Sequence, residues 1–244
     1  MNGDDGRLLI AIPCYNESEN IGDLLTELAD VDQPWEIVVI DDGSTDGTAE
    51  KIPPGVRVLR SATNAGVGAA VGQAVRIARE EGFDFVLQLD GDGQHPPAEI
   101  EALLAVYRSH PTDIVIGSRF GTRNAFRSTW DRRAGIRLIR GALSTLFGLN
   151  VTDPTSGFRL LNRRAIDFFA SGHPPLYPEP VSLARAVQAG LTISEVSVRM
   201  RPRRHGKSSI EGFKKATYIL NVIRDLVSAK LSVPAGRLET EAPD

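Results

Sequence analysis

Apolar and polar positions alternate in blocks along the first half of the chain. Short, nearly continuous apolar runs predict buried strands at 8–12, 36–40, 56–59, 83–89 and 114–116. Between them, the helical spacing of apolar residues such as Ile21, Leu24 and Leu28 predicts helices near 21–28, 45–51, 66–81 and 96–107. Strands that alternate with helices predict an α/β fold, in which helices cover both faces of a mostly parallel sheet.

The second half of the chain is less regular. Apolar spacing predicts helices near 128–147, 180–189 and 210–231, and residues 153–159 form a loop that opens onto another segment. The alternation of Val196, Val198 and Met200 with polar residues predicts a half-exposed strand. We expect one domain over 1–232, followed by a flexible tail at 233–244.

Composition excludes several classes of protein. The single cysteine, Cys14, rules out a disulfide framework and a cysteine-based zinc site. No apolar stretch approaches the length that spans a bilayer, and Asp4 and Asp5 stand where a signal peptide would carry basic residues. These features predict a cytoplasmic protein. The net charge of -3 hides two basic blocks, at 119–140 and 199–215, which are either solvated faces or surfaces for phosphate or an anionic membrane.

Polar residues follow five of the predicted strands, at 13–17, 41–42, 64–66, 90–92 and 117–119. Ligands of parallel sheets bind beyond the carboxyl ends of the strands, so these five segments predict a site at one edge. Asp90 and Asp92 flank Gly91 directly after an apolar run. Such a pair is either a solvated acidic turn or a site for Mg²⁺ or Mn²⁺, and its place among the other polar strand ends favours the metal.

Other segments admit two interpretations at this stage. Asp41 and Asp42 form a plain turn or bind a nucleoside, and Arg119 makes a surface ion pair or binds phosphate. The basic segment 203–208 is a solvated loop or a clamp on a diphosphate, because arginine pairs with phosphate in a bidentate manner. Its Gly206-Lys207-Ser208 is not a P-loop, because Arg201 stands where the first glycine belongs.

Taken in order, these motifs resemble those of family 2 glycosyltransferases of the GT-A fold, and in particular dolichol-phosphate mannose synthases and related polyprenyl-phosphate glycosyltransferases. The resemblance covers about 210 residues and rests on the motifs at 12–17, 39–48, 64–68, 90–96, 117–119, 156–159 and 203–208. It implies that 1–119 bind a nucleotide sugar and that 120–232 bind the acceptor. The chain departs from the family at Gly206-Lys207-Ser208-Ser209, which lacks a terminal lysine, and in having no transmembrane helices after the catalytic domain.

The resemblance also implies roles for individual residues. The nucleotide sugar would be bound by Pro13, Tyr15, Glu17, Asp42, Asn64, Gly66, Asp90, Gly91, Asp92, Arg203 and Ser208. Mn²⁺ or Mg²⁺ would be held by Asp90, Asp92 and Gln94, and the acceptor by Arg119, Arg133 and Arg159. The catalytic set would be Asp92, Arg119, Asp153 and Arg203.

The implied reaction is metal-dependent, inverting transfer of a hexose from a GDP- or UDP-hexose to a polyprenyl phosphate. A phosphate acceptor is a nucleophile at neutral pH and needs no general base, whereas a hydroxyl acceptor of a glycan or small molecule does. Asp153 and Glu179 are the candidate bases for that alternative. A nucleotidyltransferase or a non-catalytic nucleotide-sugar-binding module is a further alternative. The amphipathic segment 210–231 either contacts the inner face of the membrane peripherally or packs on the core. Nothing predicts nucleic-acid binding or an oligomeric state.

Overall fold

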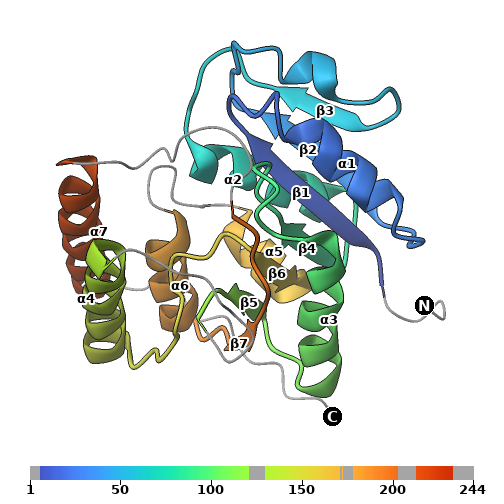
Figure 1. The fold of residues 1–244 in the computed structure, drawn as a ribbon. Coiled ribbons are helices and arrows are strands. Elements are labelled where there is room, and N and C mark those ends of the chain that lie inside the picture. The colour runs from blue at the N-terminus through green and yellow to red at the C-terminus, as the bar shows by residue number, and fades with distance from the viewer. Residues whose placement is uncertain (1–5, 121–129, 171, 173–177, 203–212, 233–244) are drawn as a thin grey trace.

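The computed structural model describes residues 6–120, 130–170, 172, 178–202 and 213–232 (Figure 1). These residues build one seven-stranded sheet with the order β3-β2-β1-β4-β6-β5-β7. The strands are β1 (Leu8–Cys14), β2 (Glu36–Asp41), β3 (Arg57–Arg60), β4 (Phe85–Gln88), β5 (Ile114–Ser118), β6 (Arg159–Asn162) and β7 (Ile193–Ser197). β6 runs antiparallel to β4 and β5, and the other neighbouring strands are parallel. The predicted α/β fold with a mostly parallel sheet is confirmed.

Helices cover both faces of this sheet (Figure 1). They are α1 (Ile21–Ala29), α2 (Val67–Glu80), α3 (Ile100–Ser109), α4 (Trp130–Phe147), α5 (Arg163–Phe169), α6 (Pro178–Gln188) and α7 (Phe213–Leu231), with short 3-10 helices η1 (Ala49–Lys51) and η2 (Pro97–Glu99). One core packs α1 and α3 against the sheet, and the other packs α2, α5 and α6, with α4 and α7 beyond them. The fold is therefore a three-layer sandwich with the sheet in the middle.

The continuous apolar run of β1 is explained by these two cores. Leu9 and Ala11 belong to the core with α2, whereas Ile10 and Ile12 belong to the core with α1 and α3. Because successive side chains of a strand point to opposite faces, a strand buried on both faces must be apolar at every position.

The second half of the structure differs from the sequence-based prediction in two places. First, β6 and the α5 helix that follows it were not predicted. β6 is only four residues long and begins with the buried Arg159, so it leaves no apolar run in the sequence. The strand predicted at 196–200 lies three residues earlier, at Ile193–Ser197, where its pairing with β5 starts from Ile193 opposite Ile114. Pairing with a neighbouring strand therefore fixed the position of β7, and the alternation of its side chains did not.

Helices α4 and α7 lie side by side at one flank of the molecule, next to α6 (Figure 1). A Cβ at Gly135 of α4 would lie 2.5 Å from Ile219 Cδ1 of α7, and Lys230 of α7 lies over the Phe147 ring of α4. These contacts join the first part of one helix to the first part of the other, and the last part to the last part. The two helices therefore run in the same direction.

Candidate active site at the carboxyl edge of the sheet

The topology brings the predicted polar segments to one edge of the sheet. β3, β2, β1, β4 and β5 all point the same way, so their carboxyl ends meet there. Because β6 is antiparallel, its first residue, Arg159, lies at this edge as well. The loops that follow β1, β2, β3, β4 and β5 and the loop 153–158 before β6 therefore surround one region.

The loops after β1 and β2 are joined by hydrogen bonds. The backbone N–H groups of Asn16, Glu17 and Ser18 donate to Ser44 Oγ, Thr48 Oγ1 and Asp46 Oδ2 at 3.0, 2.9 and 3.0 Å. Asp46 Oδ1 also accepts from Thr48 N at 3.0 Å. Partial burial raises the pKa of Asp46. The hydrogen bonds from Thr48 and Ser18 lower it by more, so this pKa lies below its usual range. This places Tyr15, whose side chain is 46% exposed, on a firmly held loop beside the buried Pro13.

Asp42 joins the end of β2 to the start of α2. Its carboxylate accepts hydrogen bonds from Ala65 N at 3.0 Å and from Gly66 N at 2.7 Å, and its side chain is buried. Gly43 makes this close approach possible: its φ is +75°, and a Cβ there would lie 2.8 Å from the backbone carbon of Thr63. Asn64 is exposed, and its side-chain oxygen accepts from Gly66 N. Asp42, Asn64 and Gly66 thus lie together in one hydrogen-bonded cluster, and their role in binding a donor stays a prediction.

The acidic pair of the turn after β4 has a different environment. Burial raises the pKa of Asp90, and the negative charges of the nearby Asp92 and Glu179 add to this effect, so that the pKa is about 7. Asp92 is buried, and its Oδ1 accepts a hydrogen bond from Gln94 N at 3.0 Å, which shapes the turn. Neighbouring glycines give the turn room: a Cβ at Gly91 would lie 2.5 Å from Cys14 Sγ, and one at Gly157 would lie 2.8 Å from Asp90 Oδ1.

These residues fit a divalent cation. An unbalanced negative charge costs free energy at Asp90, and a cation would remove that cost. Within the described ranges, no group of three or more His, Cys, Asp or Glu residues is close enough to hold a metal by itself. A cation on Asp90 and Asp92 would therefore need further oxygen ligands. Mg²⁺ and Mn²⁺ commonly take them from the phosphates of a bound nucleotide.

Arg119 and Asp153 form a buried ion pair beside this turn. Arg119 Nε and Nη2 donate to Asp153 Oδ2 and Oδ1 at 2.5 and 2.6 Å, and Arg119 N donates to Oδ2 at 3.0 Å. The two side chains are 6% and 0% exposed. Burial alone would raise the pKa of Asp153, but the adjacent guanidinium holds it below its usual range. Asp153 is thus the counter-charge of the buried Arg119 guanidinium.

The guanidinium of Arg159 is also buried, but its partners are neutral. It donates to the backbone oxygens of Ser156, Pro154 and Glu179 at 2.8, 3.0 and 3.2 Å, and to Ser182 Oγ at 2.9 Å. Burial lowers the pKa of Arg159. The side chain therefore ties the loop before β6 to the first turn of α6.

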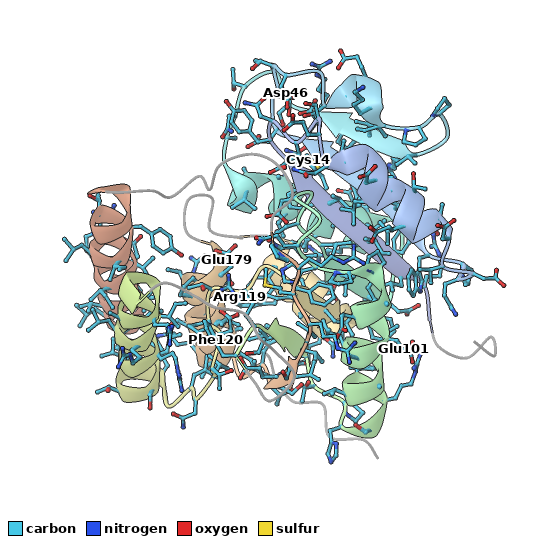
Figure 2. All side chains as sticks on the ribbon, in the orientation of Figure 1. Cys14, Asp46, Glu101, Arg119, Phe120 and Glu179 are labelled. Atoms are coloured by element: carbon cyan, nitrogen blue, oxygen red, sulfur yellow. The ribbon has the colours of Figure 1, made fainter. Side chains whose placement is uncertain are left out.

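Glu179 stands in the first turn of α6 and faces the same region. Burial raises its pKa, and the nearby Arg159 offsets part of that effect. Figure 2 shows Glu179 and Arg119 near each other between the sheet and α6, whereas Asp46 lies near the β2 and β3 end. Glu179 and Asp90 each influence the pKa of Arg119, so the carboxylates and guanidinium groups here form one electrostatic cluster.

The remaining predicted residues are an exposed arginine on α4, one neighbour of the acidic turn, and two residues outside the described ranges. Arg133 is exposed on α4, and Arg203 and Ser208 lie outside the described residues. Gln94 is placed by Arg201, whose N–H donates to Gln94 O at 2.8 Å while its guanidinium donates to both carboxylate oxygens of Glu27. His95 stacks on Phe158, and burial lowers its pKa to about 4, so it is neutral.

Two contributors to this edge were not predicted from the sequence. Arg201 braces the acidic turn, and Glu195 of β7 accepts hydrogen bonds from Thr152 N and Asp153 N at 2.7 Å each. Glu195 carried one usable signal, because it is a charged residue within a short β-branched segment. Its partners lie more than forty positions away in the sequence, so local pattern could not identify them.

Comparison with known proteins identifies a family for the chain. The family model described as Glycosyl transferase family 2 matches residues 9–169. The undecaprenyl-phosphate mannosyltransferase of Micrococcus luteus is 31% identical over 229 residues, which cover 89% of this chain and 93% of that protein. The polyprenol monophosphomannose synthase of Mycolicibacterium smegmatis is 29% identical over 217 residues, covering 84% of this chain and 82% of that protein.

A solved structure shows the same fold. The glucosyl-3-phosphoglycerate synthase of Mycobacterium tuberculosis, crystallised with Mn²⁺, uridine diphosphate and phosphoglyceric acid, superposes with a TM-score of 0.70 at 21% identity. The match covers 95% of this chain and 81% of that protein. The α/β fold is thus the GT-A fold, and the chain belongs to glycosyl transferase family 2.

Proposed function

We propose that this protein transfers a hexose, with inversion, from a GDP- or UDP-hexose to a polyprenyl phosphate. The observation that carries the proposal is the pairing, at one sheet edge, of an acidic turn at Asp90 and Asp92 with the buried cation Arg119. The acidic turn suits a metal-bound diphosphate, and Arg119 suits an anionic acceptor. The names of the relatives from Micrococcus luteus and Mycolicibacterium smegmatis support a lipid phosphate as the acceptor and mannose as the sugar.

On the donor side, Asp90, Asp92 and Gln94 would hold Mn²⁺ or Mg²⁺. The cation, when bound, stabilises the negative charge that develops on the leaving nucleoside diphosphate. Pro13, Tyr15 and Glu17 line the loop that would receive the nucleoside. The carboxylate of Asp42 is engaged with the amides of Ala65 and Gly66, so its part would include holding the Asn64–Gly66 loop against the donor.

On the acceptor side, an oxygen of the lipid phosphate would attack the anomeric carbon as the bond to the diphosphate breaks. That oxygen is ionised at neutral pH, so the step needs no general base. Asp153 is poorly suited to be one, because its lone pairs are occupied by Arg119 and its pKa is lowered. We assign it the task of orienting Arg119, which would bind the acceptor phosphate. Arg159 would act by shaping the loop before β6.

A hydroxyl acceptor is the second candidate, and Glu179 is the observation that favours it. Burial raises the pKa of this carboxyl group, as is typical of a general base near neutral pH. In that mechanism Glu179 would remove the proton of an attacking hydroxyl. The Glu179→Gln variant should then lose transfer to hydroxyl acceptors and keep transfer to lipid phosphate.

The test of acceptor class is product identification. Purified protein with Mn²⁺ is incubated with radiolabelled GDP-mannose or UDP-glucose and a polyprenyl phosphate, and label is followed into the organic phase. Acid-labile, lipid-extractable label supports the proposal. Donor binding without lipid labelling, together with label in an aqueous glycan, would replace it with the hydroxyl mechanism.

We further propose that α4 and α7 contact an anionic membrane. On α7, Leu220 and Leu231 are 70% and 80% exposed and share one helical stripe with Val227. On α4, Leu138 is 62% exposed beside the exposed Arg137 and Arg140. Exposed apolar residues flanked by arginines are typical of helices that lie in a membrane interface. Among the described helices, none has the length and apolar character needed to cross a bilayer.

Sedimentation with lipid vesicles tests this surface. Binding to vesicles that contain phosphatidylglycerol should exceed binding to neutral phosphatidylcholine vesicles, and the double variant Leu220→Ser, Leu231→Ser should reduce it. The matched control is Val58→Ser, which removes an exposed apolar side chain from the distant β3. Equal binding of the double variant and the control would refute this role for α7.

A further inference from the structure

Glu195 lies on the edge strand β7, opposite Ile116 in the parallel register with β5. Both of its carboxylate oxygens accept backbone N–H groups: Oε2 from Thr152 and Oε1 from Asp153, each at 2.7 Å. Hydrogen bonds to an ionised carboxylate are short and stronger than those between neutral groups. Glu195 therefore fixes two consecutive peptide units in the loop that leads to β6.

The two residues held by Glu195 are those that contact the end of β5. Thr152 Oγ1 lies 2.7 Å from Ser118 Oγ, and the Asp153 carboxylate accepts three hydrogen bonds from Arg119. Ser118 and Arg119 are neighbours in sequence. The contact at Ser118 therefore helps to fix the backbone from which the Arg119 side chain extends, and the contacts with Asp153 orient that side chain. A chain of short polar contacts thus runs from β7 through the loop to the Arg119 guanidinium.

We infer that Glu195 is a positioning residue for Arg119, acting through the backbone of Thr152 and Asp153, and so determines how well the enzyme binds the phosphate of its acceptor. This inference rests on the proposed function, in which Arg119 binds that phosphate. Glu195 contacts neither Arg119 nor the substrate in this scheme. It sets the place of the Asp153 carboxylate, which in turn sets the plane of the guanidinium.

The test is the Glu195→Gln variant, assayed with a short-chain polyprenyl phosphate in detergent. Glutamine can accept only one of the two N–H groups and turns a donor toward the other. We expect KM for the acceptor to rise about tenfold, with KM for the nucleotide sugar unchanged. Glu195→Ala should have a larger effect, and Glu195→Asp, which keeps the charge on a shorter side chain, a smaller one. Unchanged acceptor KM in the glutamine variant would overturn the inference.

A matched control separates positioning from simple destabilisation. Asp113 is a buried carboxylate that, like the half-buried Glu195, accepts a backbone N–H, from Thr192 at 2.7 Å, and it also accepts a hydrogen bond from Arg164 at 2.9 Å. Asp113 directly precedes β5, so it lies at the other end of that strand from Ser118. Asp113→Asn should lower the melting temperature without raising the acceptor KM. An equal rise of the acceptor KM in this control would show that Glu195 acts only through stability.

A double-mutant cycle with Arg119→Lys distinguishes failure of this inference from failure of the proposed function. If Arg119→Lys leaves the acceptor KM unchanged, the proposed role of Arg119 is wrong. If it raises the KM and Glu195→Gln in that background adds little, the two residues act as one unit, as we infer. If the two effects multiply fully, Glu195 acts independently of Arg119 and the inference fails.

Discussion

Two groups of carboxylates at the same edge of the sheet are in opposite electrostatic states. In the loops after β2, Asp42 and Asp46 accept backbone N–H groups, and the pKa of Asp46 is lowered. In the turn after β4, burial and nearby carboxylates raise the pKa of Asp90 to about 7. Figure 2 shows how far apart Asp46 and the Glu179 region lie along this edge.

The difference supports the proposed place of a cation at the turn after β4. Backbone amides supplied by the fold already satisfy the first group, so its charge stabilises the loops themselves. At Asp90 of the second group, burial and the nearby carboxylates outweigh the groups that lower its pKa, so a bound cation would be favourable there. A pair of acidic residues in the sequence therefore does not by itself indicate a metal site. The neighbouring amide groups decide whether the negative charge of a carboxylate is already stabilised by the fold.

The largest expected effect is on catalysis by Asp90→Asn. If Asp90 holds a cation as we propose, its removal should lower kcat/KM by about a thousandfold, because a catalytic cation supplies several kcal/mol of transition-state stabilisation. Thermal stability without metal should be unchanged or higher, because the variant also removes an unfavourable buried charge. Steady-state transfer and calorimetry measure the two quantities. A stable variant with nearly full activity would show that Asp90 holds no essential cation.

The next effect is on stability, and it comes from the carboxylate that an arginine neutralises. Asp153→Asn leaves the buried Arg119 without its counter-charge and should destabilise the protein by about 3 kcal/mol. The matched control is Asp167→Asn, which breaks the half-exposed pairs with Arg163 and Arg79 and should cost less than about 1 kcal/mol. Urea unfolding measures both. Equal losses would mean that burial adds nothing to the Arg119 pair.

Much of the sheet could be predicted because its strands are local patterns. β1, β2 and β4 are apolar at nearly every position, and β-strands buried on both faces leave that signal in the sequence. β6 left none, because Arg159 begins it and is satisfied by carbonyl groups from the preceding loop and from α6. A buried cation with such partners cannot be distinguished from a surface arginine by sequence spacing.

The candidate site was predictable in location and less so in detail. Asp90, Asp92 and Arg119 follow strands whose direction was evident, so their meeting at one edge followed from topology. The partners of Asp42 and Asp153 were not evident, since Gly66 and Glu195 are 24 and 42 positions away from them. Sequence therefore identified which side chains carry charge, and the structure shows which charges are already paired.

A smaller effect is expected for Asp46→Asn, the amide-bonded counterpart of Asp90→Asn. It should destabilise the protein by about 1 kcal/mol, because the exposed side chain would accept the hydrogen bonds donated by the N–H groups of Thr48 and Ser18 more weakly. Looser attachment of the loop after β1 should raise KM for the nucleotide sugar severalfold and leave metal activation unchanged. Titration of activity with Mn²⁺ checks the last point, and a shifted activation constant would remove the distinction between the two groups.

The smallest effect is the pH dependence of stability without metal, where the two groups should have opposite signs. The pKa of Asp90 is raised in the folded state, so its contribution is greatest below about pH 4 and is lost as pH rises through about 7. The pKa of Asp46 is lowered, so its contribution is lost only as pH falls below the usual aspartate range.

In EDTA, the melting temperature of the wild type should therefore fall by a few degrees more than that of Asp90→Asn between pH 5 and pH 8. Added Mn²⁺ should remove this difference in slope, because the cation binds the ionised form and takes the place of the proton. Parallel curves for the two proteins in EDTA would mean that Asp90 is already compensated in the folded chain, and the contrast between the two acidic groups would no longer hold.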